Sequence, residues 1–283
     1  MKPTLSFRLT VTKMKTPRLI RIHYVVLIAA ALLAATPPAS ARITRSRSSG
    51  TTGTRLPDGT LSLLTPVYSL VFGSGFEFQR DKDQTEYGFP ILIEYSLSER
   101  LKLTVEPRFG RIVGRTPGVR SVSGFGDLET TVDYEFLSER RYRPALSLEG
   151  AIRWPTAADP DLGDPGRDYT LGLIASKDFV FVNIDLNALY TFIGDREQDD
   201  TVEVTLASEW RVNHYLGVIG EVASVRRMGS FRDRSVGDRN ETEATVGLAW
   251  QVSKYLKFEQ GIVFKEHGVW EAVFAWEWSF DGE

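Results

Sequence analysis

A strict alternation of apolar and polar side chains recurs along the chain. It is clearest over residues 269–280, where Trp270, Phe274 and Trp278 share one parity and Glu271 lies on the other. Successive side chains of a β-strand point to opposite faces, so each such segment predicts a ribbon with one apolar and one polar face. Membrane-spanning barrels are built from ribbons of this kind.

Twelve segments are predicted to be strands on this basis. They are residues 75–80, 87–97, 101–112, 126–137, 144–154, 168–177, 179–192, 201–212, 216–226, 242–252, 256–265 and 269–280. Bacterial single-chain barrels have an even number of antiparallel strands. The sequence therefore predicts an all-β fold, a transmembrane antiparallel up-and-down β-barrel of about 12 strands.

The predicted connections alternate in length. Short ones lie at residues 98–100, 177–178, 213–215 and 253–255, with a medium one at 138–143. Most of the longer ones are residues 113–125, 155–167, 193–200 and 227–241. Outer-membrane barrels have short periplasmic turns and longer extracellular loops. Both ends of the barrel are therefore expected in the periplasm.

Aromatic residues gather near both ends of the predicted strands. Near the short turns lie Tyr95, Tyr134, Phe136, Trp210, Tyr215, Trp250, Tyr255, Trp276, Trp278 and Phe280. Near the longer connections lie Phe89, Phe109, Trp154, Tyr169, Tyr190, Phe192, Phe264 and Trp270. Two aromatic belts one strand length apart are typical of a barrel that spans a bilayer. The alternative is the ordinary enrichment of aromatic residues in strands.

Residues 1–41 have the pattern of a secretory signal peptide. Six basic and no acidic residues accompany an apolar run over 24–35, and Ala39-Ser40-Ala41 supplies small residues for cleavage. The run is too short for a stable membrane-spanning helix. We expect cleavage after Ala41, and translation starting at Met14 would leave a signal of ordinary length.

The segment after the signal is rich in Ser, Thr, Gly and Arg. Over residues 42–60 almost nothing is apolar, so burial cannot offset the entropy of ordering the chain. We expect a flexible periplasmic leader there and the outer-membrane barrel over residues 61–283.

Charge and composition exclude several classes of protein. Removing the six positive charges of the signal from a net charge of −3 leaves a mature chain of −9, which does not favour nucleic acid. The chain has no cysteine, so disulfides, thiol metal ligands and a bacterial lipid anchor are excluded. We expect an exported protein of the bacterial outer membrane.

The inward face of the barrel is the expected functional surface. Parity places there Glu94, Lys102, Glu106, Arg108, Asp127, Asp133, Glu135, Glu149, Arg153, Asp185, Glu203, Glu209, Arg211, Glu221, Lys257, Glu259, Glu271 and Glu277, together with Glu77, Glu129 and Lys265. Most are acidic, and an acidic wall favours cations or neutral solutes if water fills the lumen. The alternative is that these groups pair across strands and close a narrow barrel.

Other clusters suggest weaker alternatives. The acidic loop residues Asp159, Asp161, Asp164 and Asp168 could hold calcium, but they lack the full twelve-residue ligand pattern. The basic residues of one long connection could pair with lipopolysaccharide phosphates, or simply be solvated. These are Arg226, Arg227, Arg232, Arg234 and Arg239.

Catalysis is not expected. No Gly-x-Ser-x-Gly motif is present, His23 leaves with the signal, and His214 and His267 lie in predicted connections. A membrane phospholipase would need a histidine and a serine adjacent on the outward face, and the strand pattern offers no such pair. The sequence predicts no metal and no cofactor.

Three short motifs resemble a known family. They are Gly124-Phe125-Gly126-Asp127-Leu128, Pro144-Ala145-Leu146 and Trp154-Pro155-Thr156. Their order is similar to that in the outer-membrane proteins associated with the meta-pathway of phenol degradation, described as transporters, and the likeness runs from about Gly75 to the end. The chain departs from the pattern at Ala157, where glycine is expected, and in the three residues after Phe280, where such barrels commonly finish on the aromatic residue. The resemblance implies uptake of small molecules, aromatic ones included.

The motif residues also have structural interpretations. Gly124 and Gly126 are expected to adopt backbone angles that let a long loop re-enter the sheet, and Asp127 then begins an inward row. Pro155 is expected to end a strand at an external loop.

The sequence thus predicts a channel or transporter for passive passage of small solutes, or else a closed barrel with a structural or adhesion role in the envelope. Its expected partners are outer-membrane lipids and lipopolysaccharide, the barrel-assembly machinery and a small-molecule solute.

Overall fold

The computed structural model describes residues 69–80, 84–114, 120–195, 198–228, 241–265 and 269–280. All of them belong to one compact unit, residues 49–283. The predicted signal peptide, the leader and the three residues after Phe280 lie outside the described residues.

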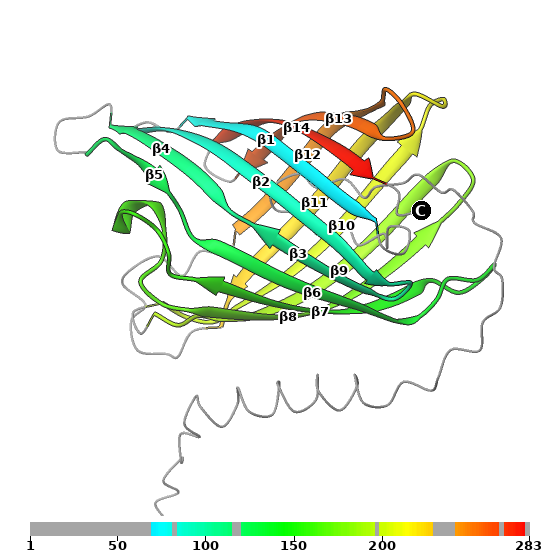
Figure 1. Cartoon of the computed structure of the whole chain (residues 1–283), viewed down its shortest axis with the longest axis horizontal. Helices are drawn as coiled ribbons and strands as arrows, with labels where there is room; N and C mark the ends of the chain where they lie inside the picture. The colour runs from blue at the N-terminus through cyan, green and yellow to red at the C-terminus, as the bar shows by residue number, and fades with distance from the viewer. Residues whose placement is uncertain are drawn as a thin grey trace, which may run out of the picture. The chain divides into compact units, whose positions relative to one another are not determined.

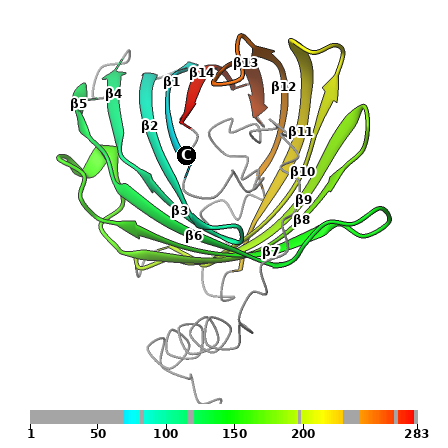
Figure 2. The same cartoon turned by 45° about the vertical axis from the view of Figure 1, so that its right-hand side comes forward.

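Fourteen strands form one antiparallel sheet in the described part of the chain (Figure 1). Their bounds are β1 Leu70–Arg80, β2 Gln84–Ser98, β3 Leu101–Glu106, β4 Arg108–Gly114, β5 Val122–Phe125, β6 Leu128–Leu137, β7 Ala145–Trp154, β8 Asp168–Asp178, β9 Val182–Phe192, β10 Thr201–Arg211, β11 Leu216–Arg227, β12 Glu241–Gln251, β13 Leu256–Lys265 and β14 Trp270–Phe280. Because β1 pairs with both β14 and β2, the sheet closes into a barrel (Figure 2).

The fourteen strands fill twelve positions in the wall. The strands β3 and β4 follow each other along β2, and β5 and β6 lie beside them in the same way. Pro107 separates β3 from β4 because it has no amide hydrogen for the ladder, and its carbonyl oxygen still accepts a bond from Ile91 at 2.9 Å. The predicted closed antiparallel barrel of twelve strands is confirmed, with two of its strands interrupted.

Several strand bounds differ from the predictions, and three of the differences have a clear structural cause. The first strand begins at Leu70 rather than Gly75, because the preceding five residues pair with β14 and with β2. The predicted loop 113–125 is shorter, since β4 continues to Gly114 and β5 already begins at Val122. Strand β9 begins at Val182 rather than at Phe179. Phe179 belongs to the preceding turn, in which its backbone amide donates a hydrogen bond to the Val182 carbonyl.

The two faces of the wall have opposite character. Large apolar side chains on the outer face are exposed, including Phe72, Leu186, Leu206, Val246 and Phe274. The inner face carries most of the buried polar and charged side chains, which reverses the arrangement of a water-soluble sandwich. Among the described residues, no helix is long and apolar enough to cross a membrane.

A continuous chain of aromatic rings crosses the outer face near the longer connections. It runs over five neighbouring strands, and successive ring centroids lie 5.2 to 6.3 Å apart. The rings, in order, are Trp270, Phe78, Tyr87, Phe76, Phe89, Phe109 and Phe125. Three of them belong to the predicted belt on this side of the barrel.

Candidate functional site: the lumen and its external mouth

The predicted inward residues have the strand parity of the buried face. Ten of the eighteen are buried, namely Glu94, Lys102, Asp133, Glu149, Asp185, Glu221, Lys257, Glu259, Glu271 and Glu277. Seven are partly exposed, namely Glu106, Asp127, Glu135, Arg153, Glu203, Glu209 and Arg211, and Arg108 is exposed. They share this parity because successive side chains of a strand alternate between its two faces.

Carboxylates outnumber cations on the buried inner face. Buried acidic residues are Glu77, Glu94, Asp133, Glu149, Asp168, Asp185, Glu221, Glu259, Glu271 and Glu277, whereas the buried basic residues are Lys102 and Lys257. Cations that are not themselves buried, Arg108, Arg153 and Lys265, pair with three of these carboxylates, Glu77, Asp168 and Glu271.

Each buried lysine contacts two carboxylates near the shorter turns: Lys102 on β3 contacts the neighbouring strands β2 and β6, whereas Lys257 on β13 contacts its own strand and the non-adjacent β10. The Lys102 Nζ atom lies 3.2 Å from a carboxylate oxygen of Asp133 and 3.5 Å from one of Glu94. The Lys257 Nζ atom lies 2.7 Å from Glu259 and 3.2 Å from Glu209. These ion pairs cross-link the inner wall, which is the structural role considered for them in the sequence.

The end of the barrel with the longer connections, called the external mouth after its predicted orientation, is shaped by the connection between β7 and β8, residues 155–167. This loop contains one 3-10 turn, Pro160–Leu162, and begins at Pro155 directly after β7, as predicted. Asp127 organises it from the start of β6. One Asp127 oxygen accepts bonds from the amides of Thr156 and Ala157, both at 3.0 Å, and the other accepts a bond from the Asp164 amide at 2.8 Å.

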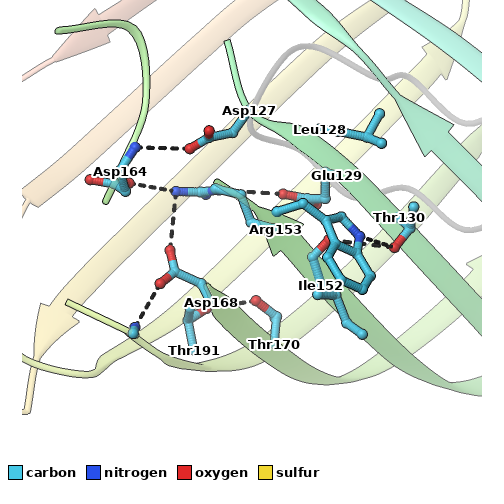
Figure 3. Close-up of polar contacts among 12 residues, drawn as sticks. Asp127, Leu128, Glu129, Thr130, Ile152, Arg153, Asp164, Asp168, Thr170 and Thr191 are labelled. Atoms are coloured by element: carbon cyan, nitrogen blue, oxygen red, sulfur yellow. Dashed lines mark hydrogen bonds and ion pairs between the residues drawn. The ribbon is translucent and has the colours of Figure 1, made fainter. Parts of the chain in front are cut away.

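Arg153 holds the other end of the same loop (Figure 3). Its guanidinium lies 3.1 Å from a carboxylate oxygen of Asp164, 3.5 Å from one of Asp168 and 3.7 Å from one of Glu129. Asp168 in turn accepts a bond of 2.8 Å from the Gly194 amide. The ends of two external connections are therefore joined to the inner wall through one arginine.

The glycines of the motif have a different role from the one predicted. Neither Gly124 nor Gly126 has the positive φ that would favour glycine. Instead, a β-carbon at Gly124 would lie 3.1 Å from the Ala158 β-carbon, and one at Gly126 would lie 3.0 Å from the Leu162 carbonyl oxygen. The glycines are needed because the loop packs against the wall, and Gly110 on β4 forms part of the same flat surface.

A cavity of about 280 Å³ lies beside this loop. Its walls include the ion pair between Arg108 and Glu77 and, from β13 and β14, the ion pair between Lys265 and Glu271 at 2.9 Å. Leu162 contributes an apolar surface. The cavity therefore presents both signs of charge and one apolar wall.

The acidic loop considered for calcium is organised by arginines. The Arg120 guanidinium forms an ion pair with Asp159 and lies 3.9 Å from a carboxylate oxygen of Asp161. Arg153 forms ion pairs with Asp164 and Asp168. Within the ranges that the structure describes, no group of three or more His, Asp or Glu side chains could hold a metal ion. Arg226 and Arg227 are exposed at the end of β11, and the other three arginines considered for lipopolysaccharide, and His267, lie outside the described residues.

Sequence reasoning missed the loop residues Arg120 and Leu162. Nothing in the alternation marks them, because both lie outside the strands. The sequence feature that could have indicated Arg120 is the cluster of acidic residues after Trp154-Pro155-Thr156. Several carboxylates in one compact loop repel one another unless nearby cations pair with them.

Replacing Asp127 by alanine is expected to release the loop. Three amides lose their acceptor, and each bond to a charged group contributes about 1.5–3 kcal/mol. Limited proteolysis of the detergent-solubilised barrel should therefore cut residues 155–167 faster than in the wild type. Asp199→Ala, an exposed acid in the next connection, is the matched control. Equal cleavage in both variants would contradict the role of Asp127.

Comparison with known proteins agrees with this geometry. The profile of the family described as "Putative MetA-pathway of phenol degradation" matches residues 45–267, well over half of the chain. The chain belongs to this family. The resemblance predicted from the three motifs is thus confirmed for this member of the phenol-degradation family. No curated protein matches its sequence.

Solved structures share the fold of this family member. The COG4313 outer membrane channel from Pseudomonas putida F1 is 14% identical with a TM-score of 0.67, covering 81% of this chain and 100% of that one. The KdgM porin in complex with disordered oligogalacturonate is 9% identical with a TM-score of 0.53, covering 75% and 99%. The NanC porin is 9% identical with a TM-score of 0.52, covering 74% and 98%. The protein therefore has the fold of outer-membrane channels and porins.

Proposed function

We propose that this protein is an outer-membrane channel for the passive passage of small solutes. The observation that carries the proposal is the reversal of faces in a closed wall, apolar outside and rich in carboxylates inside. In a bilayer the outer face meets lipid and the closed ladder satisfies the backbone. Water and solutes then occupy the lumen, and no bond is made or broken.

The names of the structural relatives support the same proposal. Their printed descriptions are those of channels and porins, and the family is associated with phenol degradation. The cavity with its apolar Leu162 wall and its two ion pairs suits a small solute that combines an apolar ring with hydrogen-bonding groups. Outer-membrane lipids with lipopolysaccharide, and the barrel-assembly machinery, are the proposed partners.

Conductance and liposome swelling test the channel directly. Purified protein in a planar bilayer should give discrete conductance steps, and proteoliposomes should swell in small neutral solutes. A complete lack of flux in both assays would defeat the proposal.

The lumen is proposed to prefer cations. Exchanging Glu106, Glu135 and Glu259 for glutamine removes three inward negative charges, so the cation-to-anion permeability ratio should fall by about a factor of two or more. The ratio follows from the reversal potential in a salt gradient. Glu99→Gln, in the exposed turn between β2 and β3, serves as the control and should leave the ratio nearly unchanged. An unaltered ratio in the triple variant would refute the preference.

A closed barrel with a structural or adhesion role is the second candidate. It is favoured by the buried ion pairs of Lys102, which join β3 to its neighbours β2 and β6, and of Lys257, which joins β13 to the non-adjacent β10 on the inner face. The flux measurements separate the two candidates, since a closed barrel passes neither ions nor sugars.

A further inference from the structure

We propose that residues 155–167 form the size-selective constriction of the channel and that Leu162 sets its width. The inference rests on the proposed channel function and adds the residue that limits solute size.

The loop lies on the lumen side of the wall. Phe109 and Phe125 belong to the aromatic chain on the outer face, so the alternating positions Gly110 and Gly124 face inward. A β-carbon at Gly110 would lie 3.2 Å from one methyl group of Leu162, and one at Gly124 would lie 3.4 Å from the other. Leu162 therefore packs on the inner surface of β4 and β5, where two glycines leave room for it.

The docked position is fixed from several directions. The Ala158 amide donates a bond of 2.8 Å to the Phe125 carbonyl, which joins the loop to the edge of β5. Asp127 holds three loop amides, and Arg120 and Arg153 hold loop carboxylates. A loop held in this way narrows the mouth permanently, without needing a ligand to close it.

Leu162 faces charged groups of other strands across the external cavity. The same cavity is lined by Arg108 and Glu77 and by Lys265 and Glu271. Those four residues form ion pairs, which favour keeping their side chains in place. Truncation of Leu162 removes volume from this lining without breaking an ion pair or a hydrogen bond of the loop.

Truncation of Leu162 should therefore widen the mouth. In proteoliposomes with neutral sugars of increasing size, Leu162→Ala should raise the swelling rate of the largest sugars by about threefold or more relative to the smallest one. Leu162→Trp should lower it. Leu206→Ala, a leucine of the outer face, is the matched control and should leave the size profile unchanged.

A disulfide tests the docked position independently of flux. The chain has no cysteine, so Gly124→Cys together with Ala158→Cys introduces the only pair. The β-carbon separation of 3.1 Å is shorter than the roughly 3.5–4.5 Å that a disulfide spans, so the loop must move outward by a few tenths of an ångström to form the bond. Oxidation of the folded barrel should form the bond, seen as a thiol count of zero after unfolding, whereas Gly124→Cys with Leu206→Cys should stay reduced.

Three outcomes separate this inference from the function on which it rests. A size profile unaltered by Leu162→Ala, in a channel that does pass ions and sugars, would overturn the constriction alone. Failure of the disulfide to form would overturn the docked position. A wild-type barrel impermeable to ions would overturn the channel and the constriction together.

Discussion

Replacing Leu206 by lysine is expected to destabilise the barrel in a phospholipid bilayer by about 2–4 kcal/mol. Leu206 lies in the middle of β10 with 52% of its surface exposed, and its neighbour across the ladder is the exposed Leu186. On a wall surrounded by lipid this position is at mid-depth, where a lysine must bury its charge in hydrocarbon. Equilibrium unfolding with urea from lipid vesicles measures the difference.

Val212→Lys is the matched control for this change. Val212 is 61% exposed, but it lies in the turn between β10 and β11, where charge stays close to water. The cost should be about 0–1 kcal/mol there. If both lysines cost the same, the outer face is not in contact with hydrocarbon and the membrane location fails.

Replacing Lys102 by methionine is expected to cost about 3–5 kcal/mol. The change leaves Glu94 and Asp133 without the cation that lies between them, and all three side chains are buried on the inner face. Removing one partner of a buried ion pair is costly because the remaining charge stays desolvated. The same urea titration should show the loss as a lower midpoint with an unchanged slope.

A second substitution tests the cause. Asp133→Asn combined with Lys102→Met removes one of the two carboxylates that lose the lysine, so the double variant should be more stable than Lys102→Met alone. A double variant that is less stable than the single one would show that Lys102 acts through its packing and not through its charge.

The sequence predicted the wall well because each strand carries two independent signals. Apolar residues such as Trp270 and Phe274 mark one face, and Glu271 and Glu277 mark the other. A shift of one residue would exchange the faces of the whole strand, so parity fixes the inward set even where a boundary is wrong. The strand that begins at Leu70 is longer than predicted, and Glu77 still has the parity of the buried side chains.

The mouth was less predictable because its structure depends on contacts between distant segments. Asp127 was expected only to begin an inward row, yet its carboxylate holds amides about thirty positions further along the chain. The sequence prediction for Gly124 and Gly126 rests on the wide range of backbone angles that glycine can adopt. A glycine also permits close approach, and the two reasons cannot be distinguished until the approaching group is known. Here that group includes Leu162, which no periodic pattern marks.

The pairing of β1 with β14 has a consequence for assembly. The partners Leu70 and Phe280 are joined in register although the whole barrel separates them along the chain. Until the last strand has docked, any partial sheet keeps two rows of unsatisfied amides and carbonyls, one on each side. Unpaired strand edges of this kind are costly in hydrocarbon, and in water they tend to pair with other chains. Insertion of this protein should consequently be a late, concerted event in which both edges are protected until β1 pairs with β14.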